Sequence, residues 1–467
     1  MTGLKLGQTQ SDLPSPNPTS SYWHREPRLQ GHRTTAELPA KTDVVIVGAG
    51  ITGAFAARFL SGAGRDVVLL EAREVGWGAT GRNGGHCQPN IYASKPHIAA
   101  FELRNYHFLR ETVRAERVPC DWVSAPGVHA FYSRDLVSLA AERLERLAEL
   151  HPSLAEAARL VTDRPALERL GVPAALGAVV QEYAASLWPY KLVAWVLEDL
   201  LLRRSSGAGG FNLQTGTPAV DIQRHGGSWI VHTPRGQIAA GSVLVAANGY
   251  TSRVIPRFTD VIVPVRGQVA SLAPAWRVDS PLSHTYVFLG QWGSASMDDY
   301  LVQAAGGSRE LVYGGGRTLG TGKGWGISSD EKVDPVVAAH LRRNLNDVLG
   351  TPGGGDGGGE DEDKEMPASY EWTGIMGYSA DAHPWVGELP PSLVGGPGVF
   401  VCGGYTGHGM PVAALSARAV ADMMCGGDGG GDDLLPPEFR VTEERIERVR
   451  AGERLSVEDY EELICPF

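Results

Sequence analysis

Three glycine-rich turns in this chain have the composition of backbone that must approach a ligand closely. They lie at 48–53, 76–86 and 403–410. Glycine lets backbone N–H groups come within hydrogen-bonding reach of an anion, and a helix that begins at such a turn adds the positive end of its dipole. The chemistry expected of these turns is the binding of a phosphate-containing cofactor.

The elements around the first turn are those of a βαβ unit. An apolar, β-branched run at 43–47 predicts a strand buried on both faces, and residues 54–60 predict a helix. A second buried strand over 66–70 ends at Glu71, eighteen residues after Gly53. This context makes the glycine motif a dinucleotide-binding fingerprint, although a tight turn without a ligand could share it.

Each residue of the fingerprint has a separate task. Gly48 permits the tight turn, Gly50 lets a pyrophosphate approach the backbone, and Gly53 allows the helix to pack closely on the strand. Glu71 is expected to hydrogen-bond ribose hydroxyls. Its negative charge disfavours the 2′-phosphate of NADP.

The second and third turns narrow the choice of cofactor. The second reads Gly-Trp-Gly-Ala-Thr-Gly-Arg-Asn-Gly-Gly-His, and the third reads Gly-Gly-Tyr-Thr-Gly-His-Gly-Met between a strand-like run at 398–402 and an alanine-rich helix at 412–424. Each alone could be a polar glycine loop. In this order the three segments resemble the FAD-contacting segments of the D-amino-acid-oxidase-like family of flavoproteins. The similarity is greatest to the gamma-glutamylputrescine oxidase branch and its glycine and sarcosine oxidase relatives.

The resemblance covers residues 42–426 and implies FAD as the cofactor. It implies that the second segment passes the pyrophosphate and reaches the flavin ring, and that the third turn stabilises negative charge on the reduced ring. The cofactor-binding residues it implies are Gly48, Gly50, Ile51, Thr52, Gly53, Glu71, Ala72, Arg73, Thr80, Arg82, Asn83, Gly84, Gly85, His86, Val220, Ala247, Asn248, Gly249, Gly404, Thr406, Gly407, His408, Gly409 and Met410.

The expected fold class is α/β. A Rossmann-type FAD-binding domain, with a parallel sheet that is discontinuous in sequence, is accompanied by a second α+β substrate domain on an antiparallel or mixed sheet. We assign to the FAD-binding domain residues 41–100, 206–263 and 367–425. We assign residues 101–205 and 264–349 to the substrate domain. The pattern of residues 101–205 predicts mainly helices.

The remaining segments lie outside these two domains. Residues 1–40 form an extended leader because several prolines forbid a long helix, and Tyr22 and Trp23 could pin it to the body. Residues 350–366 are a glycine-rich and acidic loop that is expected to be disordered, and residues 426–467 form a tail with a terminal helix.

Composition excludes several function classes. The net charge of −11 argues against nucleic-acid binding. The sequence contains no apolar run of 18 residues, so no membrane span is expected. The five cysteines lack the spacing of a metal site and read as reduced thiols of a cytoplasmic protein. No metal is therefore expected. Most of the negative charge falls in the two glycine-acidic runs near 356–365 and 426–433, so it does not describe a binding surface.

The substrate pocket departs from the sarcosine oxidase pattern. The basic residues that grip a substrate carboxylate in that branch would fall near Pro89 and at Pro411, and the strand at 311–314 lacks the lysine that assists the reaction with oxygen. The resemblance places the covalent flavin cysteine of that branch near Gly374. Covalent attachment through His86 or Cys87 stays open. The candidate catalytic residues are His86, His408, Tyr300 and Arg317, with Trp292 and Tyr405 as further pocket candidates.

The resemblance implies oxidation of a C–N bond by hydride transfer to flavin N5, with O2 as the expected acceptor. The substrate would be an amine or a larger amine-containing metabolite and not a simple amino acid, because the carboxylate clamp is missing. His408 or His86 could help to deprotonate it. Two alternatives stay open: an FAD-dependent dehydrogenase or tailoring oxidase that acts on a C–O or C–C bond, and a non-catalytic FAD-binding protein.

Overall fold

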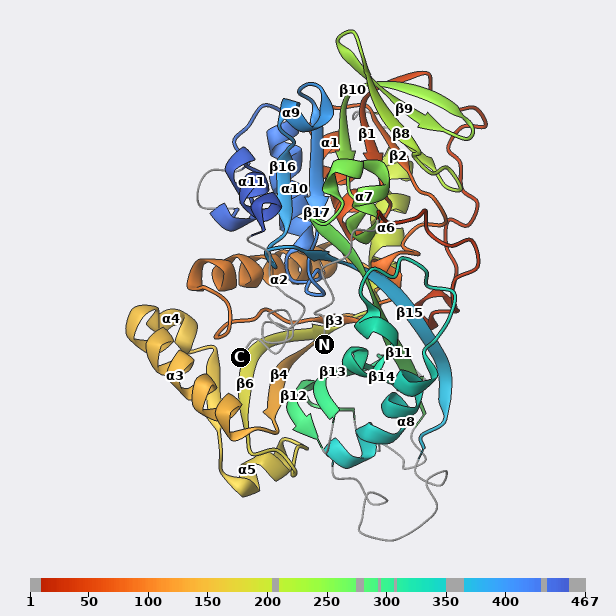
Figure 1. The fold of residues 1–467 in the computed structure, drawn as a ribbon. Helices are drawn as coiled ribbons and strands as arrows, with labels where there is room; N and C mark the ends of the chain where they lie inside the picture. The colour runs from red at the N-terminus through yellow and green to blue at the C-terminus, as the bar shows by residue number, and fades with distance from the viewer. Residues whose placement is uncertain are drawn as a thin grey trace.

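The computed structural model describes residues 10–203, 210–273, 281–292, 295–305, 309–349, 365–429 and 435–452. Two sheets lie one above the other in Figure 1, and their strands come from alternating stretches of the chain. Almost all of the expected disordered loop at 350–366, part of the second glycine-acidic run, the end of the tail with Cys465, and the side chain of Trp292 lie outside the described part.

The first sheet is mainly parallel and contains the predicted βαβ unit. β1 pairs in parallel with β2 on one side and with β10 on the other, which places their carboxyl ends at one edge. In order across the sheet the strands are β16 (Trp385–Glu388), β17 (Val399–Gly403), β10 (Gly236–Val245), β1 (Lys41–Val47), β2 (Val67–Leu70) and β7 (Phe211–Gln214). β8 (Asp221–His225) and β9 (Ser228–Thr233) extend it as an antiparallel hairpin from β10.

Helices cover this sheet with small and apolar side chains. α1 (Ile51–Gly62) packs against α10 (Ala413–Met424) and α6 (Pro189–Arg203), and nine residues of α10 are buried. Alanine is the commonest residue of α10, and α1 has three alanines and two glycines; such small side chains let the two helices approach each other closely. These two helices are the ones that follow the first and third glycine turns.

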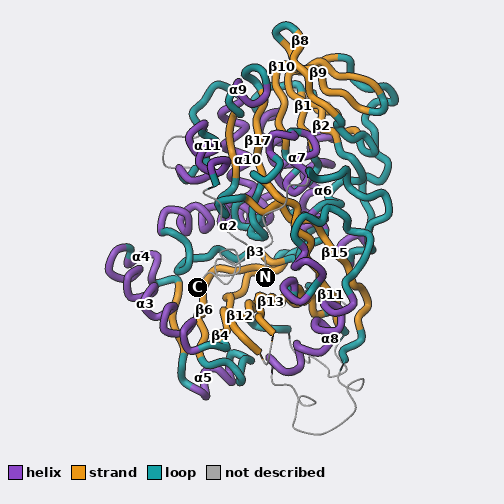
Figure 2. The backbone as a smooth tube through the Cα atoms, viewed as in Figure 1, coloured by secondary structure: helices purple, strands orange, loops and turns teal. Residues whose placement is uncertain are grey.

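The second sheet is mixed and mainly antiparallel. Its strands in order are β15 (Ala368–Ser379), β11 (Ile262–Leu272), β14 (Leu311–Gly314), β13 (Ala295–Gln303), β12 (Thr285–Trp292), β4 (Val123–Phe131), β6 (Gly177–Ser186) and β3 (His86–Cys87), with β5 (Ala158–Val161) beside β6. The pair β4–β12 is parallel. Around it lie α2 (Pro96–Glu116), α3 (Arg134–Leu150), α4 (Pro152–Ala155), α5 (Arg164–Arg169) and α8 (Pro335–Leu349), as Figure 2 shows.

Residues 101–205 are mainly helical, as expected, but they also contribute the strands β4, β5 and β6. β6 is buried at eight of its ten residues, so both of its faces are covered and no alternating pattern marks it. β3 and β15 also belong to the second sheet, although their residues fall within the ranges assigned to the FAD-binding domain. Three further helices, α7 (Thr251–Val254), α9 (Pro391–Val394) and α11 (Glu443–Ala451), are short.

The leader is pinned to the body as the sequence predicts. Tyr22 and Trp23 are 1% and 2% exposed and pack with Trp188, Tyr190 and Trp372 in one aromatic cluster. Large aromatic side chains bury much apolar area for little conformational entropy, so this cluster fixes the leader where it crosses the body. Within the described ranges, no helix is both long and apolar enough to cross a membrane.

Candidate active site

A cavity of about 690 Å³ is lined by residues from both sheets and from all three glycine turns. This size is within the range of small-molecule and cofactor sites. It lies at the carboxyl ends of β1, β2 and β10, which is the edge where doubly wound sheets bind nucleotides. Separate parts of its wall can therefore serve a cofactor and a substrate.

The first turn has the close backbone packing that the fingerprint requires. Gly48 has a φ of +106°, in the region that favours glycine. A Cβ on Gly53 would lie 1.9 Å from the Gly48 carbonyl oxygen, so only glycine fits there. The N–H of Ile51, the first residue of α1, donates to Thr80 Oγ1 at 3.0 Å and ties the second segment to this helix start.

Glu71 lies beside the first turn at the end of β2. Its carboxylate accepts hydrogen bonds from the N–H groups of Ala49 (2.8 Å) and Arg73 (2.9 Å). Burial raises the pKa of Glu71, and these two hydrogen bonds oppose part of that effect. Glu71 is thus held on the cavity wall in the position expected of a ribose-binding acid.

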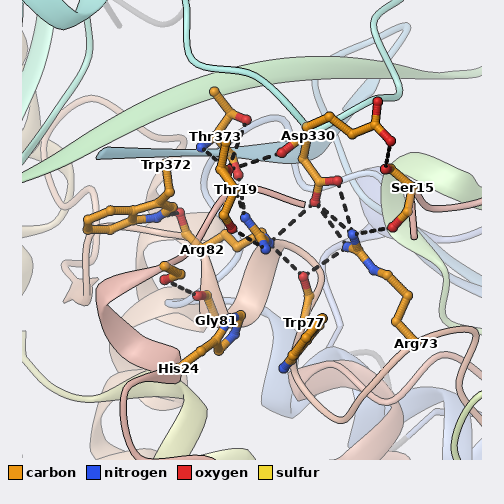
Figure 3. A network of polar contacts seen from close by, with 12 residues as sticks. Ser15, Thr19, His24, Arg73, Trp77, Gly81, Arg82, Asp330, Trp372 and Thr373 are labelled. Carbon is orange, nitrogen blue, oxygen red and sulfur yellow. Dashed lines mark hydrogen bonds and ion pairs between the residues drawn. The ribbon is translucent and has the colours of Figure 1, made fainter. Parts of the chain in front are cut away.

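The second segment is held by buried charges (Figure 3). Arg73 donates to both carboxylate oxygens of Asp330 at 3.0 Å, and Arg82 Nε lies 3.3 Å from the same carboxylate. Arg82 also donates to the carbonyls of Trp77, Thr19 and Thr373. Both arginines line the cavity as predicted, but their guanidinium groups are largely occupied by protein acceptors. Their main task is to fix the segment.

His408 is one of the polar side chains that the third turn contributes to the cavity. Its Nε2 lies 2.9 Å from Glu102 Oε2 on α2, and Glu102 is 2% exposed. Burial lowers the pKa of His408, but the charge of Glu102 and the hydrogen bond to it outweigh burial, so the pKa is raised. A proton on Nε2 donates to Glu102, which leaves Nδ1 as the ring nitrogen that can accept another proton.

Two further histidines on the cavity wall are neutral. Burial, followed by the charge of a neighbouring histidine, lowers the pKa of His86 to about 3 and that of His129 to about 3. His86 Nε2 lies 2.9 Å from Thr285 Oγ1, and His129 Nε2 lies 2.7 Å from Gln88 Nε2. Cys87, by contrast, is buried in the core and is not on the wall, so its side chain is poorly placed to anchor a flavin.

Strand β13 places Asp298 and Tyr300 on the cavity wall, two residues apart on one face. The Tyr300 ring packs directly against Gly84. A Cβ on Gly84 would lie 2.1 Å from this ring. Arg317 Nη2 lies 3.9 Å from Asp298 Oδ2. Burial raises the pKa of Asp298, and the charge of Arg317 opposes the rise. Asp298 Oδ1 has no hydrogen-bond donor among the described residues.

Most predicted residues line this one cavity, including all four catalytic candidates and Tyr405, whose hydroxyl lies 2.7 Å from Thr52 Oγ1. Five predicted cofactor residues do not line it. They are Gly53, Gly85, Val220, Gly249 and Gly404. The glycines allow close backbone packing instead: a Cβ on Gly85 would lie 2.6 Å from the Trp23 ring, and one on Gly249 would lie 2.6 Å from the Met376 carbonyl. In place of Val220, its neighbours Pro218 and Ala219 are on the wall.

Several wall residues were missed from the sequence: Gln88, Asn90, Glu102, His129, Asp298 and Tyr378. Glu102 lies in a helix whose other charged residues are mostly solvated, His129 lies in the buried half of β4, and Asp298 is half-buried in β13. No local pattern marks such positions. Only Gln88 had a usable signal, because it lies two residues after the end of the second glycine turn.

The sequence pattern of the family described as "FAD dependent oxidoreductase" matches residues 43–423, most of the chain. The chain belongs to this family. Its cofactor is therefore FAD, and it is an oxidoreductase. The "Gamma-glutamylputrescine oxidoreductase" of Escherichia coli (strain K12) is 24% identical over 427 residues, which are 87% of this chain and 89% of that protein. The "Probable oxidoreductase OrdL" of Rhizobium meliloti is 26% identical, with 83% of each chain covered.

Solved structures share the fold. The L-amino acid deaminase of Proteus vulgaris superposes with a TM-score of 0.68 at 18% identity, covering 88% of this chain and 96% of that chain. Glycine oxidase from Geobacillus kaustophilus superposes with a TM-score of 0.66 at 20% identity, covering 86% and 99%. The predicted fold class is confirmed: a Rossmann-type parallel sheet is joined to a mixed, mainly antiparallel sheet.

The residues present fit FAD. Gly48 and Gly50 of the first turn line the cavity without side chains, so a pyrophosphate can approach their backbone. Glu71 would hold the ribose, and the helix starts of α1 and α10 would face negative charge. Bound FAD would supply two-electron redox chemistry at its ring, next to the segment of wall that carries His408, His86 and Tyr300.

Proposed function

We propose that this protein oxidises a C–N bond of an amine or amine-containing metabolite, with O2 as the final electron acceptor. In this reaction the carbon next to nitrogen gives up a hydride to FAD, the nitrogen loses a proton, and the resulting imine is released for hydrolysis. The relatives named as amine and amino acid enzymes support this reaction class. The substrate is a small molecule that fits within the cavity.

The observation that carries the proposal is the set of acceptors on the wall of the cavity. Asp298 presents a carboxylate whose Oδ1 lacks a donor among the described residues, and the Glu102–His408 pair offers a proton acceptor. An amine brings N–H donors to such a wall, whereas an ether or alkane does not. His408 would take the proton from an ammonium group, because the hydride can leave only once a nitrogen lone pair is free.

The wall also supports an amine over a simple amino acid. The basic residues of the sarcosine oxidase branch are expected to fall near Pro89 and at Pro411, and both of these neutral prolines line the cavity. Arg317 is a cation on the cavity wall, and its charge is opposed by Asp298 at 3.9 Å. A substrate carboxylate would have to compete with Asp298 for that guanidinium.

The test is anaerobic mixing of the FAD-loaded protein with a panel of primary and secondary amines, followed by readmission of air. The proposal expects at least one amine to bleach the visible absorbance of the flavin, and air to restore it with release of peroxide. Bleaching by alcohols but by no amine would overturn the C–N assignment. Bleaching that air does not reverse would overturn O2 as the acceptor.

A further inference from the structure

The N-terminal leader runs along the FAD cavity. Leu13 and Pro14 line the same cavity as Glu71, Ala72 and Tyr250. The leader lies outside residues 43–423, the part that matches the family. We propose that residues 11–15 are an added wall of the FAD site that slows the release of the cofactor. This inference rests on FAD binding and is independent of the substrate.

Hydrogen bonds fix both ends of this short wall to the parallel-sheet side of the cavity. At one end, the Ser11 N–H donates to Ser252 Oγ at 3.0 Å, and the two hydroxyls lie 2.9 Å apart. At the other end, the Ser15 carbonyl accepts from Arg73 Nη1 at 3.1 Å. Ser252 lies just beyond Tyr250, and Arg73 follows Glu71, so the leader bridges two stretches that both line the cavity.

A second set of bonds ties the leader to the loop before α8 (Figure 3). Thr19 N–H donates to the Asp330 carbonyl at 2.8 Å, and Ser15 Oγ donates to Glu331. The Asp330 carboxylate in turn pairs with Arg73. The leader, the parallel-sheet side of the cavity and the loop before α8 thus meet at the buried carboxylate of Asp330. Movement of residues 11–15 away from the cavity would break contacts on both sides.

The side chain of Leu13 shows what this wall does for a ligand. It is 36% exposed, although it lies on a cavity wall between two anchored serines. Apolar surface that remains open in the protein alone gains free energy when a bound molecule covers it. Leu13 and Pro14 would cover the part of the cofactor beside Glu71, where ribose is expected.

The experiment measures FAD retention in the full chain. Residues 11–15 are replaced by Gly-Ser-Gly-Ser-Gly, and Leu13→Ala is made separately because it leaves every leader hydrogen bond in place. Holoprotein is diluted, and the fluorescence of released FAD gives its dissociation rate and Kd. The Leu13→Ala change is expected to weaken FAD binding by about fivefold, and the replacement by about tenfold or more.

The matched control replaces residues 26–30 in the same way. That stretch is also anchored, since Arg28 bonds Tyr190 and Glu198, but it does not line the cavity. The inference expects FAD release from this control within about twofold of the parent rate. It is overturned if Leu13→Ala and the 11–15 replacement both retain FAD like the parent, or if the 26–30 control loses FAD equally.

Discussion

Two aspartates, the fully buried Asp330 and the partly exposed Asp298 on the cavity wall, differ in how their charge is satisfied. Asp330 accepts three hydrogen bonds from Arg73 at 3.0 Å and lies 3.3 Å from Arg82. Asp298 has one ion pair, at 3.9 Å to Arg317, and its Oδ1 has no donor among the described residues. The two aspartates illustrate two uses of a carboxylate in this protein. A fully paired carboxylate holds segments together, and an incompletely paired one is available to a ligand.

The largest effect is expected for Asp330→Asn. It leaves Arg73 and Arg82 buried without a counter-charge, and breaking a buried ion pair costs ~3–5 kcal/mol. Urea unfolding of the holoprotein should show a loss of this size in the free energy of unfolding. The matched change Asp298→Asn should cost less than about 1 kcal/mol, because burial already penalises its charged form. Equal losses in the two variants would contradict the comparison.

The next effect concerns proton transfer at the Glu102–His408 pair. Glu102→Gln removes the charge that raises the pKa of His408, so this pKa should fall. His408 accepts a proton only when neutral, and the acid limb of kcat/KM should therefore move to lower pH by about one unit or more. His408→Gln should lower kcat/KM by about 100-fold and remove that limb. An unchanged acid limb in Glu102→Gln would exclude His408 as the base.

A smaller effect is expected for substrate binding at Asp298. With Asp298→Asn, KM for an amine should rise about tenfold, because a charge-assisted hydrogen bond to the substrate nitrogen is lost. The rate constant of flavin reduction at saturating amine should change less. Steady-state kinetics and stopped-flow reduction measure the two quantities separately. A lower rate constant with unchanged KM would place Asp298 in the chemical step and not in binding.

The smallest effect is expected for His86→Gln. Burial holds the pKa of His86 near 3, so this side chain stays neutral from about pH 5 to 9. The variant should keep the pH profile of the parent, whatever its loss in rate. Comparing the kcat/KM profiles of the two proteins checks this. A limb that shifts in His86→Gln would show that His86, and not His408, carries the titrating proton.

What could be predicted from the sequence was local. The three glycine turns, Glu71 and the first βαβ unit follow from residues adjacent in the chain, and the structure places them as expected. The residues that contact these segments are distant in the sequence. Glu102 meets His408 across 306 residues, and Arg73 meets Asp330 across 257. Such pairs depend on the packing of two sheets, which no periodicity in the sequence encodes.

The central claim is that FAD in this cavity accepts a hydride from a carbon bonded to nitrogen. The most direct measurement mixes FAD-loaded protein anaerobically with a reactive amine and with the alcohol of the same carbon skeleton, and follows the visible absorbance of the flavin. We expect the amine to bleach the flavin stoichiometrically and the alcohol to leave its absorbance unchanged. Bleaching by the alcohol alone would contradict this claim.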